Sequence, residues 1–107
     1  IRQGSSARPF AEQVQKEYQL DEMNMYVMND LKTYTNLYGL NFYLGNKFHN
    51  FGQEQPVSGF MFCTVKDLDT IQKNYGDKYT FSLLTSTKNV IADVRQRIVL
   101  CSFSQNE

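Results

Sequence analysis

Residues 36–46 read Asn36-Leu37-Tyr38-Gly39-Leu40-Asn41-Phe42-Tyr43-Leu44-Gly45-Asn46. Six of these eleven residues are large and apolar or aromatic. Such a stretch is too apolar for a solvated loop, and it is too short to cross a bilayer. We therefore expect it to pack against the rest of the chain and to organise the domain around it.

Two interpretations of this region are open. Apolar side chains recur at helical spacing after Asn29 or Asp30, which predicts a helix with one apolar stripe: Leu31, Tyr34, Tyr38 and Phe42. Gly39 weakens that helix by about 1 kcal/mol relative to alanine. The alternative is therefore a break at Gly39, with residues 40–44 as a strand. Gly45 and Asn46 end the element in either case.

The segments on either side alternate between helix and strand patterns. The apolar spacing predicts helices at 7–18 and 67–75, a loop at 52–58, a turn at 86–89 and a short helical turn at 90–95. It predicts strands at 23–28, 47–51, 59–65, 79–85 and 97–104. This order indicates one α/β domain over residues 1–107. We expect three layers, with a mixed, largely parallel sheet of four or five strands flanked by helices.

Composition narrows the classes of function. Eleven basic residues balance eleven acidic ones, which argues against a nucleic-acid partner. The chain begins with Ile1 and has no apolar run of membrane-spanning length, so we interpret it as a fragment of a longer protein.

Cys63 and Cys101 lie in predicted strands as small buried hydrophobes, and whether they form a disulfide stays open.

No catalytic or metal-binding pattern is present in the sequence. His49 is the single histidine, and we place it on the surface or on an edge strand. Asp67 and Asp69 do not share a helical face, so they do not form an acid–base pair. With no Cys-x-x-Cys motif, we predict no zinc site and no cofactor.

Two groups of residues are candidate binding sites. Ser5, Ser6 and Arg8 precede or begin the first helix, where free amides attract anions, although simple helix capping explains them as well. Aromatic side chains around the central stretch form either part of the core or a groove for sugar or lipid. The docking or groove candidates are Tyr38, Phe42, Tyr43 and Phe48.

Two segments carry a family resemblance. Residues 5–12, followed by a helix, and residues 40–46 resemble the C-terminal soluble domain of bacterial membrane glycosyltransferases similar to aminoarabinose transferase and protein mannosyltransferases. In that family a helix ending in Phe-Tyr-Leu-Gly leads into a short strand. In the predicted order of this chain, residues 47–51 form such a strand. The family often has arginine after this glycine, whereas this chain has Asn46 and Lys47.

The resemblance implies a location and a role. Such domains lie on the periplasmic side of the bacterial inner membrane, attached to the transmembrane domain of the same polypeptide. The parent enzymes use a lipid-phosphate-linked sugar donor, and their catalytic carboxylates lie in the membrane part. The resemblance therefore implies a non-catalytic domain that contacts the transmembrane domain and, through it, a lipid-linked sugar or acceptor.

The docking role is one of three classes of function that the sequence leaves open, and it makes a structural prediction. A docked domain should expose aromatic side chains near Tyr38, Phe42, Tyr43 and Phe48. The alternative is a stand-alone small α/β binding or interaction module. A third class, a flavodoxin-like nucleotide binder, is disfavoured because no glycine-rich loop follows the first strand.

Overall fold

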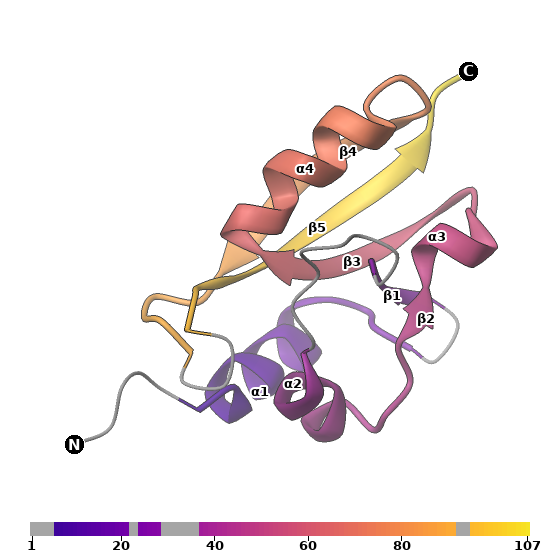
Figure 1. The fold of residues 1–107 in the computed structure, drawn as a ribbon. Coiled ribbons are helices and arrows are strands. Elements are labelled where there is room, and N and C mark those ends of the chain that lie inside the picture. The colour runs from indigo at the N-terminus through magenta and orange to yellow at the C-terminus, as the bar shows by residue number, and fades with distance from the viewer. Residues whose placement is uncertain (1–5, 22–23, 29–36, 92–94) are drawn as a thin grey trace.

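The computed structural model describes residues 6–21, 24–28, 37–91 and 95–107. Five strands form one sheet in the order β2-β1-β3-β5-β4, and four helices accompany it (Figure 1). The elements in chain order are α1 (Arg8–Glu17), β1 (Met25–Val27), α2 (Tyr38–Tyr43), β2 (His49–Asn50), α3 (Phe51–Glu54), β3 (Ser58–Thr64), α4 (Val65–Tyr75), β4 (Tyr79–Ser86) and β5 (Ile98–Gln105).

The sheet is mixed, as the sequence predicts, but it is not largely parallel. Strand β1 runs parallel to both β2 and β3. Strand β5 runs antiparallel to both β3 and β4, and β4 and β5 are the longest strands, with eight residues each. No helix is described between β4 and β5, and a parallel pair would need a long crossover connection there.

Side chains alternate between the two faces along the central strand β3. Phe62 belongs to a core cluster that contains Phe10 and Val14 of α1 and Leu40 of α2. Met61 and Cys63 belong to a second cluster, which contains Phe51 of α3 and Ile71 of α4. Figure 1 shows α4 on one side of the sheet and α1 with α2 on the other. The alternation of side chains along β3 thus contributes buried residues to the cores on both faces of the sheet.

Most predicted elements are confirmed within one or two residues. Helix α1, edge strand β2, central strand β3 and the last two strands lie where the sequence places them. Residues 40–43 are helical, so the alternative strand at 40–44 is wrong. Gly45 and Asn46 follow α2 with φ values of 90° and 57°, a left-handed backbone that ends the helix. The predicted start of this helix, at residues 29–36, lies outside the described residues.

Three boundaries differ from the prediction. Helix α3 occupies the first part of the predicted loop at 52–58, because the side chain of Asn50 caps it and Phe51 is fully buried. Helix α4 begins at Val65, two residues before the predicted start at Asp67. In the predicted helical turn at 90–95, Ile91 accepts a hydrogen bond from the backbone N–H of Arg95 at 2.8 Å and also forms an antiparallel bridge with Gln96, and residues 92–94 lie outside the described residues.

Candidate functional site

Helix α2 presents an aromatic pair on the side that does not pack on the core. Leu40 and Leu44 are buried against the cluster that contains α1. Phe42 is 67% exposed and Tyr43 is 40% exposed, and their rings meet edge-to-face with centroids 5.4 Å apart. We call Phe42 and Tyr43 the aromatic pair of α2. The edge-to-face contact holds the two rings together on the surface.

The other two docking candidates do not extend this surface in the described structure. Phe48 is half-buried and stacks on Phe62, with ring centroids 5.2 Å apart and planes 19° apart. It therefore covers the core cluster under α1 and α2. Tyr38 is the first residue of α2, and its side chain lies outside the described part of the chain. Among the candidate side chains that the structure describes, the exposed ones are therefore the aromatic pair of α2.

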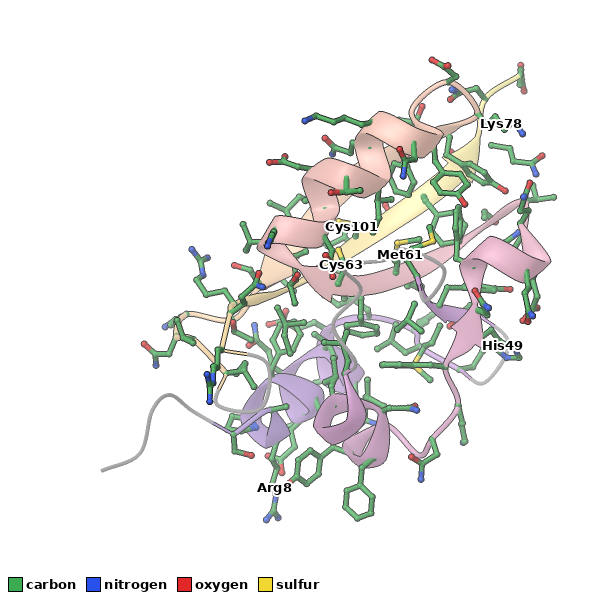
Figure 2. The ribbon with its side chains drawn as sticks, in the orientation of Figure 1. Arg8, His49, Met61, Cys63, Lys78 and Cys101 are labelled. Atoms are coloured by element: carbon green, nitrogen blue, oxygen red, sulfur yellow. The ribbon has the colours of Figure 1, made fainter. Side chains whose placement is uncertain are left out.

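Two of the three anion-binding candidates, Ser6 and Arg8, make local contacts at the start of α1. The Ser6 hydroxyl accepts a hydrogen bond from the backbone N–H of Arg8, at 3.1 Å. The Nε of Arg8 lies 3.0 Å from Oε1 of Glu12, one helical turn later, and both side chains are mostly exposed. Figure 2 shows Arg8 projecting outward from α1. Ser5 lies outside the described residues. The N-cap residue of α1 is Ala7, which makes no side-chain capping hydrogen bond, so the prediction of Ser6 as the N-cap is wrong and Ser6 instead binds the N–H of the first helical residue.

His49 lies on edge strand β2, as predicted. Its Nδ1 is 3.0 Å from Oε2 of Glu54 on α3, and its ring lies 5.5 Å from the ring of Tyr26. Burial, with the Glu54 charge as a second cause, raises the pKa of the Tyr26 phenol. The contact between His49 and Glu54 ties β2 to α3.

The two cysteines meet inside the second core cluster. Both are buried, free thiols in the structure (Figure 2). The side-chain hydrogen bond between them raises the pKa of Cys63, and burial raises it further. The same hydrogen bond lowers the pKa of Cys101, against the effect of burial. The sequence predicts buried strand cysteines but does not predict that they lie in the same cluster on neighbouring strands.

A cleft of about 410 Å³ lies between the start of α1 and the connection that follows β4. This volume is within the range of small-molecule sites. Hydroxyl and amide groups supply most of its polar lining, and Lys88 supplies one charge. The lining residues are Ser6, Pro9, Phe10, Gln13, Thr85, Ser86, Thr87, Lys88 and Asn89.

The sequence does not predict this cleft. Its lining comes from two segments more than sixty residues apart, Ser6–Gln13 and Thr85–Asn89, so it exists only after folding. The run of Thr85, Ser86 and Thr87 was the sole local signal, and hydroxyl residues at that place are typical of a turn. Ser86 and Thr87 are also used structurally, because Arg97 donates hydrogen bonds to the Ser86 hydroxyl and the Thr87 carbonyl.

Two further observations concern the described residues as a whole. None of their histidine, cysteine and acidic side chains gather in groups of three that could hold a metal ion. Nor does any of their helices combine the length and the apolar character that crossing a membrane requires.

Comparison with known proteins gives no relative for this chain: no protein-family model, no curated protein and no solved structure matches it.

Proposed function

We propose that this chain is a non-catalytic docking domain of a membrane-bound glycosyltransferase that uses a lipid-phosphate-linked sugar donor. In this proposal the domain lies on the periplasmic side of the bacterial inner membrane. It contacts the transmembrane domain of the same polypeptide and shapes access for the lipid-linked sugar or its acceptor. No residue of the chain is assigned a catalytic role.

The aromatic pair of α2 is the observation that carries the docking part of the proposal. Phe42 and Tyr43 lie within the stretch that resembles the glycosyltransferase domains, and they expose 67% and 40% of their surface. Phe and Tyr are among the residues enriched at the centres of protein interfaces. Their neighbours Leu40 and Leu44 fix the helix on the core, so the pair is presented from a packed element.

The reading frame that contains Ile1 tests the identity of the parent protein. We expect it to encode several apolar stretches of about twenty residues upstream, each long enough to span a bilayer. A frame that encodes no such stretch would overturn the glycosyltransferase proposal and leave a stand-alone module.

Photo-crosslinking in the full-length protein tests the docking surface. A benzoylphenylalanine in place of Phe42 should crosslink to the transmembrane part in membranes. The matched control places the same group at Val57. This residue is 69% exposed and lies in the connection between α3 and β3, outside α2. Equal crosslinking from both positions, or none from Phe42, would contradict docking through α2 even if the parent is a glycosyltransferase.

The cleft beside α1 favours the second candidate, a stand-alone small α/β binding module. Its volume of about 410 Å³ and its hydroxyl and amide lining suit a small polar ligand. A ligand that binds the native state raises the apparent thermal stability. A saturable shift with a small polar compound, lost in Gln13→Ala, would therefore favour this module.

A further inference from the structure

The buried thiols occupy diagonal positions on neighbouring antiparallel strands. Cys63 on β3 is opposite Val99, and Cys101 on β5 is opposite Met61. Because side chains two residues apart on a strand share a face, Met61 and Cys63 point to the same side of the sheet as Cys101 and Val99. Both thiols therefore lie in the core cluster beneath α4, where Figure 2 labels them next to each other.

The distance between the two backbones is near the limit for a disulfide. Diagonal positions on an antiparallel pair are about 7–8 Å apart at Cα, whereas disulfides join Cα atoms about 4.4–6.8 Å apart. Cys63 and Cys101 nevertheless lie on the same face of two hydrogen-bonded strands and in the same buried cluster, so their thiols are near each other across the strand pair. Closing the bond thus requires a small approach of β3 and β5, and a bond closed in this way is more easily reduced than a relaxed one.

We propose that Cys63 and Cys101 form an oxidation site, at which a disulfide oxidant converts the two thiols into a reversible intrachain disulfide between β3 and β5. The thiolate of Cys101 attacks the oxidant and displaces one thiolate, which takes up a proton. Cys63 then loses its proton and attacks Sγ of Cys101, and the second half of the oxidant leaves as a thiol. One oxidant disulfide is reduced to two thiols as the two cysteines are oxidised.

Thiol acidity is consistent with this order of attack. The pKa of Cys101 is lowered by the Cys63 hydrogen bond, so Cys101 is the thiol that more readily becomes the attacking thiolate. The pKa of Cys63 is raised, so Cys63 keeps its proton until the mixed disulfide has formed. Since both side chains are buried, the oxidant gains access only when α4 opens locally over the sheet. The inference does not depend on the proposed function.

The test exposes the folded 107-residue chain to oxidised glutathione, quenches with acid, unfolds the protein and alkylates the remaining thiols. We expect a product that has lost two hydrogens, carries no glutathione or alkyl group, and yields one crosslinked peptide containing residues 63 and 101. Dithiothreitol should restore both thiols. The midpoint of thermal unfolding should rise in the oxidised form, because the crosslink restricts the unfolded chain.

Two controls test whether disulfide formation depends on the closeness of Cys63 and Cys101 in the folded chain. Cys63→Ala and Cys101→Ala should each give no crosslinked peptide. The urea-unfolded wild-type chain should form the bond with an equilibrium constant lower by about tenfold or more, equivalent to about 30 mV. Alkylation of both thiols after oxidation, a crosslink between chains, or equal bond formation in the folded and unfolded chain would each overturn the proposal.

Discussion

At the scale of single residues, Thr64 joins a strand directly to a helix. It is the last residue of β3 and the N-cap of α4, and its buried hydroxyl accepts a hydrogen bond from the backbone N–H of Asp67, at 3.2 Å. Thr64→Val keeps the size and shape of the side chain but removes this acceptor. We expect the free energy of unfolding to fall by about 1 kcal/mol, measured by urea denaturation.

Thr64→Ser is the matched control, because it keeps the hydroxyl and loses only a methyl group. It should preserve the hydrogen bond to Asp67 and destabilise the protein less than Thr64→Val does. If the valine variant were as stable as the wild type, the capping role of Thr64 would be contradicted.

The same position shows why sequence patterns miss boundaries between elements. Thr64 and Val65 are β-branched and continue the apolar pattern of β3, so they read as strand residues. The acidic Asp67 then reads as the first possible helix start. In the structure no loop separates the strand from the helix, and Thr64 serves both. A pattern that assigns each residue to one element cannot locate such a junction.

At the scale of elements, α2 has one face that packs on the core and one that is exposed in the described structure. Leu40 is 1% exposed in the core, whereas Phe42 is 67% exposed. We expect Leu40→Ala to lower the free energy of unfolding by about 2–5 kcal/mol, the usual cost of a core cavity. Phe42→Ala should change it by less than about 0.5 kcal/mol. Urea denaturation of the two variants makes the comparison.

The comparison of Leu40→Ala with Phe42→Ala is also a control for the docking experiment. A loss of crosslinking or activity in a Phe42 variant of the full-length protein can be attributed to the interface only if the domain stays folded. A large destabilisation by Phe42→Ala would mean that the ring supports the fold, and the exposed aromatic pair would then lose its status as a docking surface.

Helix α3 is the element that the sequence could not predict. It has four residues, including Gly52, and isolated helices of this length are unstable in water. Its stability comes from Phe51, whose ring contacts those of Tyr75, Tyr79 and Phe103 at centroid distances of 5.2, 4.9 and 5.0 Å. These partners come from α4, β4 and β5, so no local pattern around residue 51 could indicate them.

At the scale of the whole molecule, the sequence predicted strand positions better than strand directions. Hydrophobic periodicity locates buried strands, and all five lie close to their predicted places. Direction depends on how each connection returns to the sheet, and β4, the outer neighbour of β5, pairs with it antiparallel. The aromatic pair of α2 was predicted because it is contiguous in sequence. The cleft and the thiol contact were not, because each joins residues from distant segments.

The two core clusters share the strands that separate them, which predicts a single cooperative unfolding unit. Phe62 contributes to the cluster under α1 and α2, and its neighbours Met61 and Cys63 contribute to the cluster under α4. Loss of packing on one face should therefore release the other face as well. In Phe62→Ala we expect amide hydrogen exchange to accelerate in α4 as much as in α1, although α4 lies across the sheet from the substitution.

Native-state hydrogen exchange measured by mass spectrometry tests this expectation, with Leu83→Ala as the control. Leu83 is also a large apolar residue of the sheet, but it is 62% exposed, so its removal should leave exchange in both helices close to wild type. Faster exchange in α1 with unchanged protection in α4 would show that the faces unfold separately. In that case the alternation along β3 would position the two layers without coupling their stability.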